Sequence, residues 1–82
     1  MDKTMDMTIA TPEGIVFEGR VESAKFPGAK GAFMILPRHA PLISALMPGV
    51  VTYVQDGKPT EVPIQGGFVE VNKDVISVCV EI

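Results

Sequence analysis

"TMDMTIA", residues 4–10, and "VISVCVEI", residues 75–82, decide the fold class of this chain, because both alternate apolar and polar side chains. In the first stretch, Met5, Met7 and Ile9 share one face. In the second stretch, the corresponding face is formed by Ile76, Val78, Val80 and Ile82. A period of two residues is typical of a β-strand that buries one face. Both ends of the chain are therefore predicted to be strands.

The chain between these two stretches consists of short runs rich in β-branched or aromatic residues, each closed by Gly, Pro, Asn or Asp. Breaks every 8 to 12 residues or so are typical of a sandwich or barrel. Asp56–Gly57 predicts a tight hairpin turn, and Pro27 followed by Gly28 predicts a type II turn. The best candidate for a helix, "LISALM" at residues 42–47, is too short to decide anything. The predicted strand runs are IVFEG, RVESAKF, GAFMIL, VVTYVQ, TEVPIQ and GFVEV.

Length and composition exclude several classes of protein. Eighty-two residues are predicted to form a single β-sandwich domain, residues 1–82. The net charge of −3, from seven basic and ten acidic side chains, argues against a nucleic-acid binder. Trp is absent and Tyr53 is the single tyrosine, so the chain has few aromatic side chains on which nucleic-acid bases could stack. No apolar stretch reaches the length of a signal peptide or the roughly 20 residues of a membrane span, so a soluble, non-exported protein is expected.

Few residues offer catalytic chemistry. His39 is the single histidine, and without a second histidine a structural or interface role is favoured over catalysis or metal binding. Cys79 excludes an internal disulfide, and its place in an alternating strand predicts a small core or half-buried residue. No helix follows Gly66–Gly67, so a sheet corner or bulge is favoured over a phosphate site. No catalytic residue, metal or cofactor is predicted, which leaves a binding or structural module.

Three blocks of the sequence, in the order and at the spacing in which they occur, resemble a known family. They are TPEGIVFEGRVES, LPRHAPLISALMPGVV and QGGFVEV. Together they resemble the N-terminal β-domain of the epsilon subunit of F-type ATP synthase, over residues 7–80. The combination is specific, although each block alone is weak. The resemblance implies an all-β fold, a flattened β-sandwich of about ten short strands.

The resemblance also implies a function. It implies a non-catalytic subunit of the central stalk, which couples rotation of a proton- or sodium-driven membrane ring to ATP synthesis. The implied partners are the gamma subunit and the polar loops of the c-ring, with no cofactor. The implied location is peripheral, on the cytoplasmic face of the inner membrane, and the isolated chain is expected to be a monomer.

Two contact surfaces are carried over by position from the resemblance. An irregular apolar edge stiffened by proline would lose little entropy on docking, which suits a contact surface. The gamma-facing residues are Thr11, His39, Ala40, Pro41, Leu42, Ile43 and Ser44. The ring-facing residues are Gly28, Ala29, Lys30, Gly31, Ala32 and Phe33.

The chain departs from the family pattern in several ways. Relatives often carry an acid where this chain has Ala32, and a glycine where it has Met34 or Arg38. From Arg20 to Arg38 there are four basic side chains and one acid, which predicts a positively charged ring-facing loop. Family members usually continue into a helical hairpin that carries inhibition and ATP sensing, so neither property is expected of these residues. The native-looking start favours a naturally short chain.

An alternative from another class is a lipoyl- or biotinyl-type carrier domain, which is also a small β-sandwich. Such a domain presents one lysine at a hairpin tip, and Lys58 beside Asp56–Gly57 is the lysine that fits. Pro59 follows it, where carriers usually have an acidic residue or a methionine. A small β-barrel enzyme or nucleic-acid binder is less favoured, because catalytic groups and positive charge are lacking.

Overall fold

The computed structural model describes residues 3–82, and within these residues the chain forms nine strands and no helix. The all-β prediction is therefore confirmed. Residues 42–47, the best candidate for a helix, instead contain a strand. The strands are β1 (Met5–Thr11), β2 (Gly14–Val21), β3 (Ser23–Gly28), β4 (Gly31–Ile35), β5 (Leu42–Leu46), β6 (Gly49–Gln55), β7 (Lys58–Ile64), β8 (Gly66–Asn72) and β9 (Val75–Glu81).

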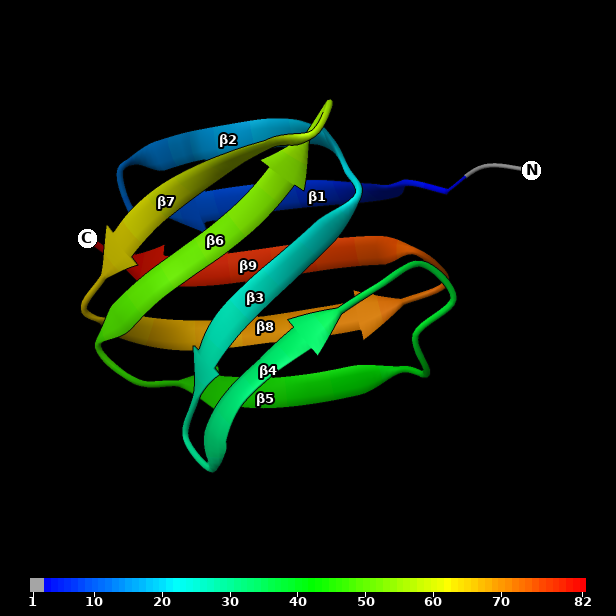
Figure 1. The fold of residues 1–82 in the computed structure, drawn as a ribbon. Coiled ribbons are helices and arrows are strands. Elements are labelled where there is room, and N and C mark those ends of the chain that lie inside the picture. The colour runs from blue at the N-terminus through cyan, green and yellow to red at the C-terminus, as the bar shows by residue number, and fades with distance from the viewer. Residues whose placement is uncertain (1–2) are drawn as a thin grey trace.

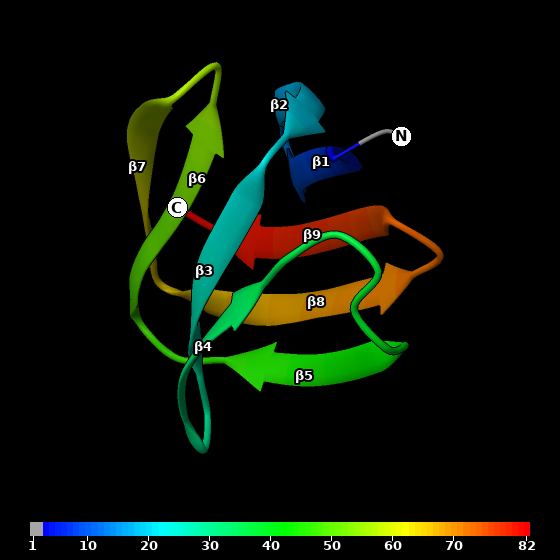
Figure 2. The ribbon, with the colours of Figure 1, turned by 45° about the vertical axis from the view of Figure 1, so that its right-hand side comes forward.

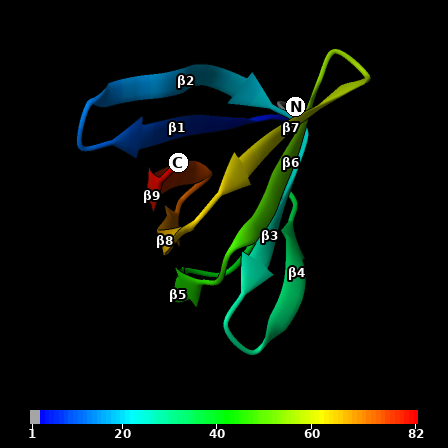
Figure 3. The same ribbon diagram turned by 90° about the vertical axis from the view of Figure 1, so that its left-hand side faces the viewer.

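The nine strands form one sheet that folds over on itself into two layers (Figures 1 and 3). The strand order is β2-β1-β9-β8-β5-β3-β6-β7, with β4 paired to β3. We call β2, β1, β9, β8 and β5 the back layer, and β4, β3, β6 and β7 the front layer. The two strands nearest the ends of the chain, β1 and β9, pair in parallel, and the other pairs are antiparallel. The predicted β-sandwich is confirmed.

The back and front layers are joined by strand pairing at one side of the sandwich and by a chain connection at the opposite side. Between β5 and β3 the pairing is reduced to Gly28 and Leu46, and the Met47 N–H donates to the Pro27 carbonyl at 2.8 Å. At the opposite side, the chain leaves β2 at Val21 and enters β3 at Ser23. The run RVESAKF, predicted as one strand, is thus interrupted at Glu22, where the chain passes from the back layer to the front layer.

The core lies between the layers and is formed by the inward positions of the alternating strands. Met5, Met7 and Ile9 are buried as predicted. Ile76, Val78 and Val80 are buried too, but Ile82 is 63% exposed because it follows the end of β9. The prediction for Ile82 was therefore wrong. The front layer contributes Ala24, Phe26, Ile35, Val51, Tyr53 and Ile64.

Two of the predicted turns had different outcomes. Asp56–Gly57 forms the two-residue turn between β6 and β7, with φ values of 52° and 75°, as predicted. The type II turn at Pro27–Gly28 was wrong, because both residues belong to β3 and the turn lies at Ala29–Lys30. Gly28 is needed for a different reason: a Cβ there would lie 2.6 Å from the carbonyl oxygen of Gly31, across the hairpin.

Gly66–Gly67 begins β8, and the prediction of a sheet corner fits this place. Gly67 has a φ of 144°, and a Cβ there would overlap the backbone carbonyl of Cys79 on β9. Only glycine adopts this conformation readily. The close approach of β8 and β9 at this end of the back layer therefore depends on Gly67.

Candidate partner interface

One line of apolar side chains crosses the whole outer face of the back layer. Each of its five strands contributes one residue, and the strand pairing aligns these residues from β5 to β2. We call this line the apolar row. Ile15 is 62% exposed and Phe68 is 52% exposed. In order, the apolar row consists of Ala45, Phe68, Cys79, Ala10 and Ile15.

The neighbouring line of side chains on the same face is mostly polar. It begins with Ile43 on β5, which at 73% is the most exposed large apolar residue of the described chain. Glu70, Ser77, Thr8 and Glu18 complete it across the other four strands. A contiguous exposed apolar patch with a polar rim marks an interaction site. The apolar row together with Ile43 has this character.

A shallow hollow lies beside the middle of the apolar row, and the predicted contact residue Thr11 lines it. The Thr11 hydroxyl donates to the Gly14 carbonyl at 3.2 Å and accepts from the Glu13 N–H at 3.1 Å, so the β1–β2 turn is held in place. The hollow gives the outer face a concave feature beside Phe68. Its lining residues are Ala10, Thr11, Pro12, Gly67, Phe68, Cys79, Val80 and Glu81.

The block from His39 to Ser44 forms the chain into β5 and the first half of that strand. His39, Ala40 and Pro41 are exposed, and the His39 Nδ1 lies 2.7 Å from the Ala40 carbonyl oxygen. Beyond the single contact with β3 at Leu46, β5 pairs on one side with β8. The block therefore lies on a sheet edge, in keeping with the apolar edge expected from the sequence.

Within this block, alternate residues point in opposite directions. Leu42 is partly buried and packs against the core, whereas Ile43 points outward. The Ser44 hydroxyl donates to the Ala45 carbonyl at 3.0 Å. Only Ile43 of these three carries an apolar side chain on the outer face.

Thr11 and His39 are not brought together by the fold. Thr11 follows Ala10 beyond the apolar row, whereas His39 precedes the row by several residues, and β1 and β5 run in the same direction. β9 and β8 lie between the two strands, which separates them by about 14 Å across the sheet. The apolar row runs from Ala10, next to Thr11, to Ala45, next to Ser44, so it connects Thr11 with the Ser44 end of the predicted gamma-facing set.

The predicted ring-facing residues form the β3–β4 hairpin, which projects at the bottom of Figures 1 and 2. Ala29 and Lys30 form its exposed tip. The Phe33 ring points inward instead, with its centroid 5.7 Å from that of Phe26. Gly28, Gly31 and Ala32 complete the hairpin next to the turn.

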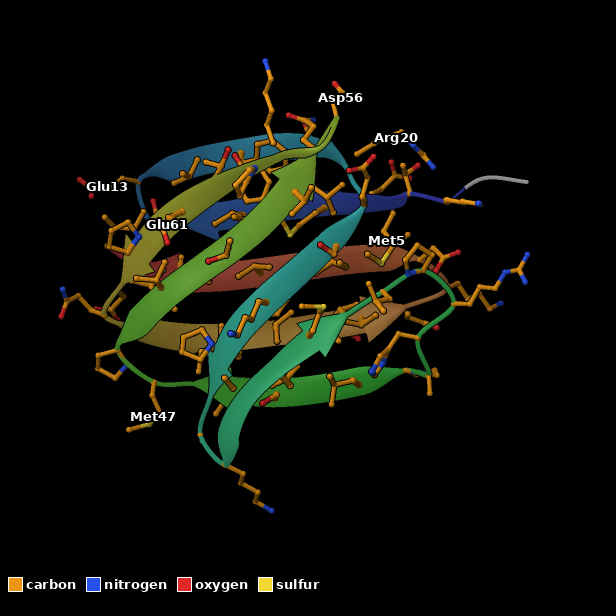
Figure 4. The ribbon with its side chains drawn as sticks, viewed as in Figure 1. Met5, Glu13, Arg20, Met47, Asp56 and Glu61 are labelled. Atoms are coloured by element: carbon orange, nitrogen blue, oxygen red, sulfur yellow. The ribbon has the colours of Figure 1, made fainter. Side chains whose placement is uncertain are left out.

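The basic residues between positions 20 and 38 do not gather at this hairpin, so the expectation of a strongly positive loop needs correction. Arg20 lies on β2 at the far end of the molecule, where it pairs with Asp6 at 3.0 Å (Figure 4). The Arg38 N–H donates to the Asp74 carboxylate at 2.6 Å, beside the β8–β9 turn. Lys25 and Lys30 are the basic residues that lie on the hairpin.

Three further features concern metal binding, the free thiol and membrane spanning. Among residues 3–82, no three His, Cys, Asp or Glu side chains lie close enough together to hold a metal ion. Cys79 is exposed, so its prediction as a core or half-buried residue was wrong. The alternation of β9 directs Val78 and Val80 inward and leaves Cys79 on the outer face. Within the same described residues, no helix is long and apolar enough to span a bilayer.

Residues of the apolar row were missed at the sequence level. Phe68 and Cys79 occupy positions where an alternating strand usually carries a polar side chain. Apolar residues at these positions were the one indication of an apolar outer face. The apolar row depends on which strands are neighbours and on the register of their pairing. A single sequence does not reveal strand order or register.

Comparison with known proteins identifies relatives along almost the whole chain. The domain family described as "ATP synthase, Delta/Epsilon chain, beta-sandwich domain" matches residues 4–82. The ATP synthase epsilon chain of Nitratiruptor sp. is 43% identical over 79 residues, which cover 95% of this chain and 61% of that protein. The ATP synthase epsilon chain of Desulforamulus reducens is 44% identical over 78 residues, covering 95% and 59%. The chain thus spans about three fifths of the length of these relatives.

Solved structures share the fold at lower identity. A chain in the mitochondrial ATP synthase of Euglena gracilis, a structure of OSCP, F1 and c-ring, superposes with a TM-score of 0.91 at 20% identity. The alignment covers 98% of this chain and 52% of that one. A chain in the central stalk and c-ring structure from Tetrahymena thermophila gives a TM-score of 0.78 at 15% identity, covering 95% and 63%. The carrier-domain alternative built on Lys58 receives no support from these comparisons.

Proposed function

Because the chain belongs to the ATP synthase delta/epsilon chain β-sandwich domain family, we propose that it is a non-catalytic subunit of the central stalk of an F-type ATP synthase. It helps to couple rotation of the proton- or sodium-driven membrane ring to ATP synthesis in the headpiece. The family match over residues 4–82 carries this proposal. Residues 1–82 act as one β-sandwich domain that is monomeric in isolation and needs no cofactor.

The proposed gamma-facing surface is the outer face of the back layer together with the His39–Ser44 edge. Exposed apolar side chains support this choice, since Ile43, Phe68 and Ile15 lie on this face.

The proposed ring-facing surface is the hairpin from Gly28 to Phe33, which would rest on polar loops of the c-ring. Its exposed tip at Ala29 and Lys30 supports the proposal, since a projecting turn can reach a second partner while the back layer contacts the first. In the complex, the chain would lie on the cytoplasmic face of the inner membrane as a peripheral component.

The test is direct binding to the gamma subunit from the same organism, measured by calorimetry. The unmodified chain should bind. Ile43→Asp should weaken binding at least tenfold, because docking would bury an unpaired carboxylate. Leu42→Asp is unsuitable, because Leu42 packs against the core and its replacement would damage the fold itself.

The matched control is Thr52→Asp, which places the same charge on the outer face of the front layer, beside Lys25. This variant should bind gamma as the unmodified chain does. Absence of binding by the unmodified chain would overturn the proposed function. Equal weakening by both variants would overturn the assignment of the back layer as the docking face.

A further inference from the structure

The sheet has four edges, and they differ in how they are protected against pairing with another strand. β7 carries Pro59 and Pro63. β2 has a register shift against β1 and carries charged side chains, and β5 follows Pro41. Prolines, bulges and charges are the usual means of blocking an exposed edge. β4, with the sequence GAFMI, contains no proline, bulge or charged side chain of its own, and Lys30 is the charged residue that precedes it.

The register of the β3–β4 hairpin determines which backbone groups of β4 face outward. Pro27 lies opposite Ala32, and since proline has no N–H, this pair is not hydrogen-bonded. Hydrogen-bonded and non-hydrogen-bonded pairs alternate, so the Lys25–Met34 pair is also of the second kind. The N–H and C=O groups of Ala32 and Met34 therefore point away from β3, toward the open edge.

Nothing in the described chain occupies these groups. β4 pairs with β3 alone, and the backbone hydrogen bonds made outside strand pairs by residues 3–82 do not involve Ala32 or Met34. Met34 is 52% exposed. β4 therefore presents two donors and two acceptors in the spacing that an added strand requires.

The core is incompletely covered along the same side of the sandwich. Phe33 on β4 and Leu42 on β5 point inward but remain partly exposed, and these two strands border the open side. An apolar side chain opposite Phe33 on an added strand would face the same interior. Inward residues of the added strand should accordingly be apolar.

The outward side of the same edge is basic. Lys25 lies beside Met34 on the outer face, and Lys30 lies at the hairpin tip. Both are exposed, and neither forms an ion pair within residues 3–82. Carboxylates on the outward positions of an added strand would be attracted to these two lysines.

We propose that β4 accepts an extended segment of a partner protein, in which apolar residues alternate with acidic ones. The segment pairs through the backbone of Ala32 and Met34, turns its apolar side chains toward Phe33, and turns its carboxylates toward Lys25 and Lys30. This site lies on the front layer, is separate from the apolar row, and shares Lys30, Ala32 and Phe33 with the proposed ring-facing hairpin.

A second copy of this chain fits the edge less well. Pairing two five-residue strands buries far less than the roughly 1,000 Å² expected of a stable interface. It would also bring Lys25 and Lys30 of both copies onto one surface. The partner chemistry that fits is therefore acidic.

The test uses the isotope-labelled 82-residue chain and a capped synthetic hexapeptide of alternating valine and glutamate, followed by NMR. Addition of the peptide should shift the amide resonances of Ala32 and Met34 and slow their hydrogen exchange. A peptide with lysine in place of glutamate should bind about three- to tenfold more weakly, as expected for exposed charge pairs. Shifts confined to the apolar row, or concentration-dependent dimers of the chain without peptide, would overturn the proposal.

Two matched variants separate backbone pairing from side-chain contact. Met34→Pro removes the outward N–H without removing a bond to β3, whereas Met34→Ala shortens the side chain and keeps the N–H. The proline variant should lose at least tenfold in affinity relative to the alanine variant. Should the proline variant not fold, the hexapeptide methylated at every amide nitrogen gives the same information, because it retains its side chains but cannot pair. Equal binding of the methylated and unmethylated peptides would contradict strand addition.

Discussion

On the strands of the back layer, the apolar row on the outer face lies one residue away from a row of core residues on the inner face, which we call the inner row. The two rows differ in what covers them. Ile9, Val78 and Val69 align across β1, β9 and β8 and are at most 1% exposed. Ala10, Cys79 and Phe68 follow or precede them by one position and form the middle of the apolar row. The inner row must be apolar because the front layer packs on it. No part of the described chain packs on the apolar row, so its composition needs another explanation.

The front layer gives the contrast. On its outer face, Lys25, Thr52 and Glu61 form a polar line across β3, β6 and β7, and the exposed apolar residues there, Met34 and Val50, do not form a row across the strands. The outer face of the back layer instead carries the apolar row beside a mostly polar line. An exposed apolar patch with a polar rim supports the proposal that a partner covers this face.

The largest effect should come from placing a charge in the inner row. Val78→Asp buries an unpaired carboxylate at a position 1% exposed, at a cost of more than about 4 kcal/mol. The variant should show no cooperative thermal transition by circular dichroism. Cys79→Asp, one residue away, should change the free energy of unfolding by less than about 1 kcal/mol. Similar losses in both variants would mean that the two rows are not distinct.

The same contrast can be sharpened at the start of β5. Leu42→Asp should destabilise the chain by about 2 to 4 kcal/mol, since Leu42 packs on the core. Ile43→Asp should stay within about 1 kcal/mol of the unmodified chain. Urea unfolding of the two variants measures the difference, and the reverse order would place Ile43 in the core.

Arg38 tests a position that belongs to neither row. Its φ of 68° lies in the left-handed region, which costs a non-glycine residue about 1 to 2 kcal/mol. Arg38→Gly keeps the backbone N–H that donates to Asp74, and it should stabilise the chain by about 0.5 to 1 kcal/mol after the entropy of glycine is offset. The melting temperature should rise by a few degrees, with gamma binding unchanged. A fall in melting temperature would show that the interactions of the Arg38 side chain stabilise the chain by more than the left-handed backbone conformation costs.

The smallest effect is expected at the hairpin tip. Lys30→Glu changes an exposed side chain, so the free energy of unfolding should stay within about 0.5 kcal/mol. Gamma binding should be unchanged, because the hairpin lies outside the apolar row. Docking on the ring should change by about 1 kcal/mol or less at low salt, and this change should disappear as salt is added. A strong loss of gamma binding would place the hairpin in the gamma interface.

Much of the fold could be predicted from local pattern. The alternation in β1 and β9 identified their buried faces, and Asp56–Gly57 identified its turn, because both signals act over a few residues. The Pro27–Gly28 turn was wrong, because the pairing of Pro27 with Ala32 outweighs the local preference of the dipeptide.

The docking surfaces were less accessible to prediction. The resemblance assigned the His39–Ser44 block to a contact surface, which stays a prediction, but which of its side chains point outward depends on β5 pairing with β8. The apolar row depends on the parallel pairing of β1 and β9, strands from opposite ends of the chain. Similarly, Phe33 was expected at a contact, and its packing on Phe26 became visible only with the hairpin register.

The central claim, that the outer face of the back layer is covered by a gamma subunit, can be tested with the native thiol at the middle of the apolar row. Cys79 is the chain's single cysteine and is exposed, so its alkylation by a maleimide can be timed with and without bound gamma. The control is a thiol at Thr52 on the front layer, introduced together with Cys79→Ser. We predict that gamma slows alkylation of Cys79 at least tenfold and leaves the front-layer thiol unaffected. Equal rates at Cys79 with and without gamma, or protection of the front-layer thiol instead, would contradict the account.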